Sequence, residues 1–281
     1  MIVTTGASGQ LGRLVASALA DRLSPANVTL GARDPGKIAD FAAKGFKTAA
    51  VDFNRPEGLA TAFAGADTVL IISGDAPNDI RVRQHRAAID AAKTAGVGRV
   101  VYTSFTNATP ASLFPFAAIH ADSEAYLKAS GVPYTILRNN QYAENLTLAA
   151  AKQSGELALP GISGKVAYIT RADLAAATAA VLIEPGHDGR VYELTGAEAL
   201  TLIEVADLLT KAWATPVRAR EVPLGDYGSA LAERGLPPYV VEALVGLRQA
   251  VAAGECATVS DDARRLVGRP LETVRAFLAR P

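Results

Sequence analysis

The sequence contains one cysteine, Cys256, so no disulfide can form within the chain. A single cysteine is typical of proteins kept in a reducing compartment. An excess of either charge is also absent, because 28 lysines and arginines balance 28 aspartates and glutamates. Nucleic-acid binding needs a basic face, so we expect no nucleic-acid partner.

Long hydrophobic runs are absent too. No apolar stretch approaches the roughly 20 residues that a membrane-spanning helix requires, so we expect no membrane contact. The opening residues MIVTTGASG lack a basic segment followed by an apolar one, which argues against a cleaved signal peptide. We therefore predict a cytoplasmic protein. No set of His, Cys, Asp and Glu has a metal-ligating spacing, so no metal is expected.

Apolar residues make up 49% of the 281 residues, enough for a packed core. Up to about residue 142, β-rich segments alternate with helical ones. This alternation predicts an α/β fold, a doubly wound parallel Rossmann sheet with helices on both faces. The pattern then loosens, which suggests a smaller C-terminal α/β lobe. We expect residues 1–146 to bind a dinucleotide and residues 147–281 to bind substrate, with some segments of the latter returning to the sheet. The six expected strands lie at 1–5, 27–33, 46–53, 66–74, 98–105 and 133–140, and a helix is expected over 143–154.

A glycine-rich turn follows the first expected strand. Gly6 permits a tight turn, Gly9 lets the backbone approach a pyrophosphate, and Gly12 lets the following helix pack closely on the strand. Free N–H groups at the start of that helix would face the phosphates. A purely structural turn is the alternative, but the position between a strand and a helix is the one that dinucleotide binding requires. The predicted phosphate-binding residues are Gly6, Ser8, Gly9, Gln10, Leu11 and Gly12.

The end of the second strand bears on the choice of cofactor. Arg33 can bind the 2′-phosphate of NADP through its guanidinium, and Lys37 follows one turn later. Asp34 could instead bind a ribose, as an NAD enzyme requires, but it stands before Pro35 in a good position to cap a helix. We predict NADPH, with NADH less favoured.

Two further strand ends are candidates for cofactor contact. Asp52 and Phe53 follow the third strand, where side chains reach the adenine. Ser73 and Gly74 follow the fourth strand, where small residues let the cofactor's ribose pass. Ordinary turns have similar sequences.

The stretch AAIHADSEAYLK, residues 117–128, lacks the catalytic pair of short-chain dehydrogenases. No tyrosine in the chain is followed by a lysine four residues later. Tyr126 and Lys128 are two residues apart and point in different directions on a helix. His120 and Glu124 are four apart and share a face, so a carboxylate could keep the histidine protonated and make it a proton donor near neutral pH. An ordinary surface pair is the alternative. His85, in a long helical segment, is assigned no function.

Several stretches together resemble the NmrA-like atypical short-chain dehydrogenase/reductases, in particular the bacterial NADPH-dependent quinone reductases and triphenylmethane reductase. They are TTGASGQLG, VYTSFTNA, HADSEAYLKASGVPYTILRNNQYAENL and ITRADLAAA. The resemblance implies that Thr103 and Ser104 lie on the cofactor edge. It also implies that the loop from Asn139 to Tyr142 covers the nicotinamide and begins the substrate pocket. His120 stands where the isoflavone-reductase branch has a lysine.

These features predict an NADPH-dependent reductase that transfers hydride to a quinone, a dye or an enone. Without a dedicated acid, acceptors that stabilise the added charge themselves are favoured over ketones. His120, Asn139 and Tyr142 are the candidate catalytic residues, and Asn139 is also expected to contact the cofactor. A redox sensor of NmrA type, which binds NAD(P) without turnover, is the alternative. The expected partner is a small-molecule substrate such as a quinone, and the protein is expected to be a monomer or a homodimer.

Overall fold

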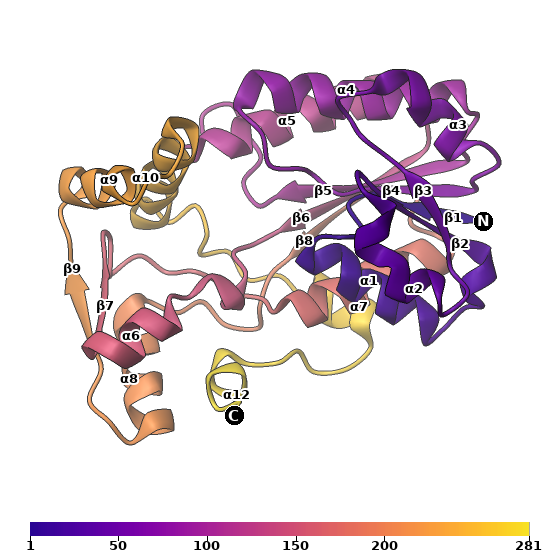
Figure 1. Ribbon diagram of the computed structural model, residues 1–281. Helices are drawn as coiled ribbons and strands as arrows, with labels where there is room; N and C mark the ends of the chain where they lie inside the picture. The colour runs from indigo at the N-terminus through magenta and orange to yellow at the C-terminus, as the bar shows by residue number, and fades with distance from the viewer. Residues whose placement is uncertain (281) are drawn as a thin grey trace. The chain divides into compact units, whose positions relative to one another are not determined.

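The computed structural model describes residues 1–280, which form two compact units (Figure 1). The first unit comprises residues 1–104, 119–138 and 174–192, and the second comprises the remaining described residues. The units are interleaved along the chain, whereas the sequence prediction divided the chain once, near residue 146. Residues 174–192 return to the first unit. The dinucleotide-binding and substrate-binding roles of the two parts stay predictions.

The first unit is built on a seven-stranded sheet of order β3-β2-β1-β4-β5-β6-β8. From β3 to β5 every neighbouring pair is parallel. The strand order reverses between β1 and β4, which is where doubly wound sheets open a crevice for ligands. The predicted Rossmann-type α/β fold is confirmed. The strands are β1 (Ile2–Thr4), β2 (Val28–Ala32), β3 (Lys47–Ala50), β4 (Thr68–Ile71), β5 (Arg99–Phe105), β6 (Tyr134–Asn139) and β8 (Arg190–Leu194).

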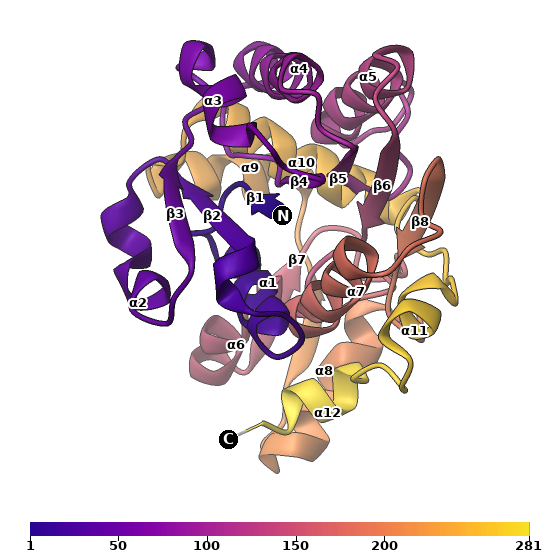
Figure 2. The ribbon, with the colours of Figure 1, turned by 90° about the vertical axis from the view of Figure 1, so that its right-hand side faces the viewer.

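Helices cover both faces of this sheet. Figure 2 shows α3, α4 and α5 along one face and α1, α2 and α7 along the other. Strands β1, β2 and β4 are buried along their whole length, as expected for strands covered on both sides. Phe63, Ile89 and Leu127 lie in the core beneath the first group of helices. The helices are α1 (Gln10–Ala20), α2 (Ala39–Ala42), α3 (Leu59–Phe63), α4 (Asn78–Thr94), α5 (Pro115–Ala129) and α7 (Arg171–Ile183), and 3-10 turns cover Pro25–Asn27, Pro35–Ile38 and Pro56–Gly58.

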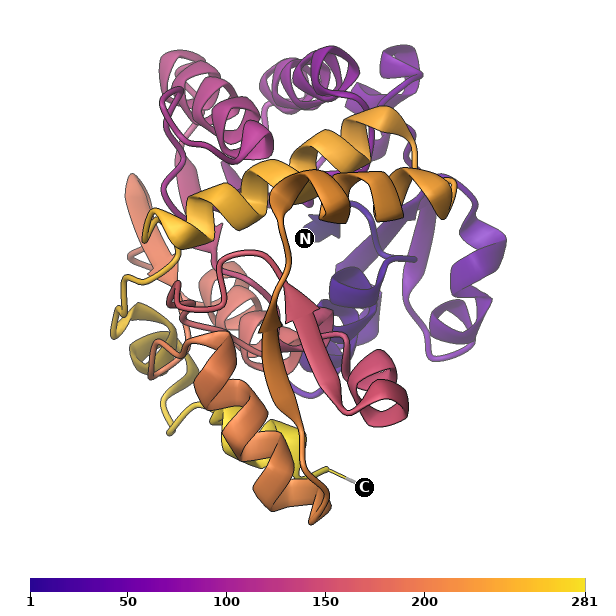
Figure 3. The ribbon, with the colours of Figure 1, turned by 90° about the vertical axis from the view of Figure 1, so that its left-hand side faces the viewer.

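The second unit contains a two-stranded parallel sheet and most of the remaining helices (Figure 3). Helix α8 begins with a capping box, in which the Thr201 side chain accepts from the Glu204 N–H and the Glu204 side chain accepts from the Thr201 N–H. Its buried face, including Leu209, packs in a core with Phe277 of α12. The elements are α6 (Leu148–Ser154), β7 (Glu156–Leu159), α8 (Leu202–Trp213), β9 (Arg218–Glu221), α9 (Leu224–Glu233), α10 (Pro238–Ala252), α11 (Asp262–Val267) and α12 (Val274–Leu278), with a 3-10 turn at Ala143–Asn145.

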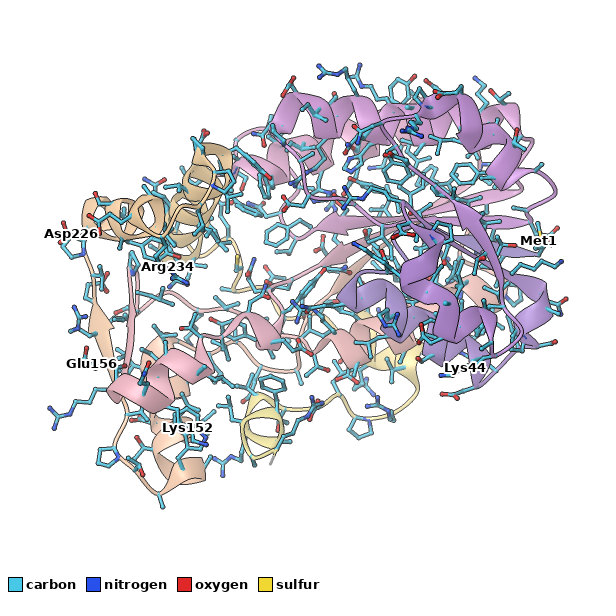
Figure 4. All side chains as sticks on the ribbon, in the orientation of Figure 1. Met1, Lys44, Lys152, Glu156, Asp226 and Arg234 are labelled. Carbon is cyan, nitrogen blue, oxygen red and sulfur yellow. The ribbon has the colours of Figure 1, made fainter. Side chains whose placement is uncertain are left out.

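One expected helix is shorter than predicted. Residues 143–145 form a 3-10 turn, Leu146 is extended, and the α-helix begins only at Leu148. The helix ends at Ser154, and the left-handed conformation of Gly155 leads directly into β7. Glu156, labelled in Figure 4, accepts a hydrogen bond from Nε of Arg220 on β9 at 2.7 Å. Across residues 1–280, no helix has both the length and the apolar character needed to cross a membrane.

Candidate active site

The glycine turn between β1 and α1 has the geometry expected of its sequence. Gly6 has a φ of +63°, a conformation that a side chain would strain. The N–H of Gly9 donates to the carbonyl of Gly6 at 3.0 Å and closes the turn. A Cβ atom at Gly12 would lie 2.2 Å from that same carbonyl oxygen, so α1 packs on the turn too closely for any other residue.

A cavity of about 270 Å³ opens beside this turn, within the first unit. It lies at the carboxyl ends of the strands on either side of the switch point, where such sheets bind dinucleotides. Gly9, the N-cap of α1, makes no side-chain capping hydrogen bond, and the first turn carries no acidic residue, so the N–H groups there are available to an anion. Eight of the predicted cofactor residues line the cavity: Gly6, Ser8, Gly9, Arg33, Asp52, Phe53, Ser73 and Gly74.

Six residues outside the predicted cofactor set also line the cavity. Gln84 of α4 is the least expected, and its side-chain amide donates to Oδ1 of Asn54 at 2.9 Å. Asn54 directly follows the predicted Asp52 and Phe53, so a longer window at that strand end would have included it. The sequence around Gln84 does not indicate a cofactor contact, because only the packing of α4 on the sheet brings this residue to the cavity. The six are Thr5, Val51, Asn54, Ile72, Asp75 and Gln84.

The structure gives Arg33 and Asp34 different roles: Asp34 caps a turn, and Arg33 faces the cavity. The Asp34 carboxylate accepts a hydrogen bond from the N–H of Gly36 at 2.9 Å and caps the turn that follows. Arg33 is exposed, lines the cavity and makes no hydrogen bond or ion pair within residues 1–280. Arg13, by contrast, is paired with Asp40. The cavity therefore presents an uncommitted guanidinium, which suits the 2′-phosphate of NADP.

The structure places the other predicted cofactor residues outside the lining of the cavity. Leu11 and Gly12 are buried in the packing of α1, and Lys37 is exposed. Thr103 accepts a hydrogen bond from the N–H of Ser73 at 3.0 Å and so ties the end of β4 to β5. Cofactor contact by this second set stays a prediction. Its members are Gln10, Leu11, Gly12, Lys37, Thr103, Ser104 and Asn139.

Glu124 is buried and bound to partners other than His120. Its carboxylate accepts from Arg138 at 2.8 and 2.7 Å and from the Ser104 hydroxyl at 2.7 Å, with Lys128 at 3.4 Å. Burial alone would raise the pKa of Glu124, but the hydrogen bonds from Arg138 and Ser104 outweigh it and hold the pKa below its usual value. The prediction that Glu124 keeps His120 protonated is therefore wrong.

His120 lies in the core, 7% exposed, with Nδ1 only 2.7 Å from the Tyr102 hydroxyl. Burial, with added repulsion from His85 and Arg81, lowers the pKa of His120 well below its usual value. The ring is thus neutral at physiological pH and is no imidazolium acid. The prediction of a proton donor near neutral pH is wrong, because the sequence did not show how deeply this face of α5 is buried. Any other part of His120 in the reaction stays a prediction.

Asn139 and Tyr142, the other two candidate catalytic residues, lie together in the second unit. The Asn139 amide donates to the Tyr142 hydroxyl at 3.5 Å, and Oδ1 of Asn139 is buried without a partner among residues 1–280. Buried polar atoms are nearly always paired, so this oxygen is ready to accept from a ligand. The Arg171 guanidinium lies 4.8 Å from the centre of the Tyr142 ring, and burial raises the pKa of Tyr142. Its hydroxyl remains protonated at neutral pH.

The tyrosine and lysine in AAIHADSEAYLK serve separate partners. The Tyr126 hydroxyl donates to Asp90 at 2.8 Å, and Lys128 pairs with Glu124. This agrees with the expectation that the two side chains cannot share a site. In the described part of the chain, no group of three or more His, Cys, Asp and Glu side chains is placed to hold a metal ion.

Comparison with known proteins supports a dinucleotide site. Residues 6–185 match the sequence model of a family described as NAD(P)H-binding. Quinone oxidoreductase 2 of Escherichia coli (strain K12) is 36% identical over 276 residues, which are 98% of this chain and 96% of that protein. The crystal structure of an Escherichia coli NADPH-dependent quinone oxidoreductase complexed with NADPH has a TM-score of 0.94 at 35% identity, covering 99% of both chains. Citrobacter sp. triphenylmethane reductase complexed with NADP(H) has a TM-score of 0.93 at 32% identity, with the same coverage.

Proposed function

We infer that this chain, which belongs to the NAD(P)H-binding family and has the NmrA-like fold of atypical short-chain reductases, is an NADPH-dependent oxidoreductase. Its acceptor is a quinone or another small molecule that takes up hydride readily. The observation that carries this choice of acceptor is the state of His120. The candidate acid is a buried, neutral histidine, and within residues 1–280 no tyrosine–lysine pair replaces it.

The chemistry of the acceptor decides how much help it needs from the protein. NADPH supplies the hydride when it is bound. A ketone that receives hydride becomes an alkoxide and needs an acid at hand, which is worth about 10²- to 10⁴-fold in rate. A quinone becomes a hydroquinone anion whose ring spreads the charge, and a cationic dye is neutralised by the hydride itself. A site without a strong acid suits the last two, because orientation then supplies most of the catalysis.

The cavity residues divide among the parts of the cofactor. Gly6, Ser8 and Gly9, with the start of α1, would hold the pyrophosphate. Arg33 would bind the 2′-phosphate. The remaining predicted contacts are Asp52 and Phe53 at the adenine, and Ser73 and Gly74 at the ribose.

Asn139 and Tyr142 are proposed to act at the reacting end. The unpaired Oδ1 of Asn139 can accept an N–H of the cofactor's carboxamide, and the protonated Tyr142 hydroxyl can donate to the acceptor. His120 can act there only as a neutral N–H donor. We further propose that the protein acts in the cytoplasm as a monomer or a homodimer.

The acceptor class is tested by following NADPH oxidation with three compounds. We expect benzoquinone and a cationic triphenylmethane dye to exceed cyclohexanone in kcat/KM by about 100-fold or more, the share that a missing general acid accounts for. Comparable turnover of the ketone would overturn the choice of acceptor while leaving NADPH binding untouched.

A further inference from the structure

Four polar side chains meet in the core of the first unit, between the sheet and the helices α4 and α5. Tyr102 comes from β5, His85 from α4, and His120 and Ser123 from α5. Tyr102, His85 and Ser123 are fully buried. The Tyr102 hydroxyl lies 2.7 Å from Nδ1 of His120 and 3.2 Å from Nδ1 of His85, and the Ser123 hydroxyl lies 2.8 Å from Nδ1 of His85.

The proton on His85 can be placed from its surroundings. Its Nε2 is buried and has no partner among residues 1–280. Buried N–H groups without an acceptor are rarer in proteins than buried acceptors without a donor, so we place no proton on Nε2 and one on Nδ1. The Ser123 oxygen can accept this proton, because the single hydrogen of Ser123 is donated to the carbonyl of Ile119 at 2.9 Å.

The proton on Tyr102 can then be placed from the two histidine contacts. Nδ1 of His85 already carries a hydrogen, which it donates to Ser123, so this nitrogen cannot accept from the Tyr102 hydroxyl. The hydroxyl hydrogen is therefore donated to Nδ1 of His120, the shorter of the two contacts. A neutral imidazole that accepts at Nδ1 carries its own proton on Nε2.

We propose that Tyr102, oriented by His85, is a positioning residue that holds His120 as the neutral Nε2–H tautomer and so fixes one N–H donor for the acceptor's oxygen. Such a donor stabilises the negative charge that hydride transfer places on a quinone oxygen, and it keeps its proton throughout. The use of this N–H in the reaction rests on the proposed function. The tautomer follows from the hydrogen bonds and the unpartnered Nε2 of His85, and does not depend on the reaction.

Burial is the main cause that lowers the pKa of His120, and the charges around the cluster do not reverse it. Arg81 of α4 is buried, and its positive charge opposes a second proton on either histidine. On α5, Asp122 pairs with Arg86 and Glu124 pairs with Arg138, so neither carboxylate contacts the His120 ring through a hydrogen bond. Burial lowers the pKa of His85 to about 3 and raises the pKa of Tyr102. The arrangement should therefore persist from about pH 5 to pH 8, where a free histidine would titrate.

Nitrogen-15 NMR of the imidazole rings tests this tautomer directly. The chain has three histidines, so long-range proton–nitrogen spectra contain three rings, assigned with His85→Gln and His187→Gln. In the wild type we expect His120 to show the Nε2–H pattern, unchanged from about pH 5 to pH 8. An Nδ1–H pattern or an imidazolium signal would overturn the proposal.

Tyr102→Phe removes the hydroxyl and keeps the ring. We expect the His120 nitrogen shifts to move toward a mixture of tautomers and kcat for benzoquinone to fall about tenfold, with the KM for NADPH unchanged. Tyr126→Phe is the matched control, because it removes a half-buried hydroxyl from α5, the helix that carries His120, without touching the buried cluster. It should change neither the His120 shifts nor kcat.

The two readouts separate the proposals. Unchanged His120 shifts in Tyr102→Phe would overturn the role of Tyr102, and altered shifts with an unchanged kcat would overturn its part in the reaction. If neither protein reduces a quinone, the proposed function fails while the wild-type spectrum still decides the tautomer. If Tyr102→Phe does not fold, the wild-type spectrum again decides.

Discussion

At the scale of single residues, neighbours in space override neighbours in sequence. His120 and Glu124 share a helical face, as their spacing predicts, yet Glu124 binds Arg138 of β6 and His120 binds Tyr102 of β5. Spacing fixes which side of α5 a residue occupies but not what the sheet presents to it. The sequence did predict the capping role of Asp34, because the cap depends only on the residues that directly follow it.

Arg33 is the residue on which the choice of cofactor depends. Arg33→Ala should lower kcat/KM for NADPH about 10- to 100-fold, because a charge-assisted pair with the 2′-phosphate is worth roughly 1.5–3 kcal/mol. NADH has no such phosphate, so its kcat/KM should hardly change. Initial rates with both cofactors at a fixed benzoquinone concentration give the comparison.

The control for this substitution is Arg190→Ala, which removes an exposed arginine at the start of β8. This substitution should leave kcat/KM for NADPH and for NADH unchanged. Equal losses for NADPH and NADH in Arg33→Ala would show that Arg33 does not bind the 2′-phosphate.

At the scale of elements, one buried carboxylate joins three of them. Glu124 of α5 accepts from Ser104 near the end of β5 and from Arg138 near the end of β6. Removing one partner of a buried charge cluster leaves the others unpaired and is costly. This cluster therefore holds the carboxyl ends of two neighbouring strands against the helix that carries His120.

Glu124→Gln should lower the free energy of unfolding by about 2–3 kcal/mol at neutral pH, because the charged hydrogen bonds are lost. The pKa of Glu124 in the folded protein lies below its usual value of 4.5, so its stabilisation is full above pH 4.5 and is lost as the pH falls below it. The difference in the free energy of unfolding between wild type and variant should therefore become smaller at acidic pH. Urea unfolding at neutral and at acidic pH measures it.

Glu57→Gln, at an exposed position, should stay within about 0.5 kcal/mol of wild type at both pH values. If the deficit of Glu124→Gln were the same at both pH values, the carboxylate would not be ionised in its native contacts.

Elements also differ in how far sequence predicts them. The six strands expected in the first half are all present, because each is a short apolar run bounded by turn residues. Strand β7 was not expected: it has four residues, and its partner β9 begins more than 50 residues later. The predicted helix over 143–154 was too long at its start, where Ala143–Asn145 form a 3-10 turn. Such short elements depend on tertiary partners, which local sequence does not show.

At the scale of the whole molecule, the predicted part of the site follows from topology. Parallel strands bring their carboxyl ends to one edge, so Gly6, Arg33, Asp52 and Ser73 could be grouped from the strand order alone. Gln84 could not, because it reaches the cavity from the side of a helix. The buried cluster around Tyr102 was equally hidden, since its members come from three elements that are separated in sequence.

The central claim is that the protein transfers hydride from bound NADPH to an acceptor and does not only bind the cofactor. The most direct test is a single turnover, in which the protein loaded with equimolar NADPH is mixed rapidly with benzoquinone and the absorbance of NADPH is followed against a protein-free control. We predict complete, single-exponential loss of the bound NADPH, much faster than in the control. Tight binding of NADPH with oxidation no faster than in the control would contradict the claim and indicate a protein that senses the cofactor.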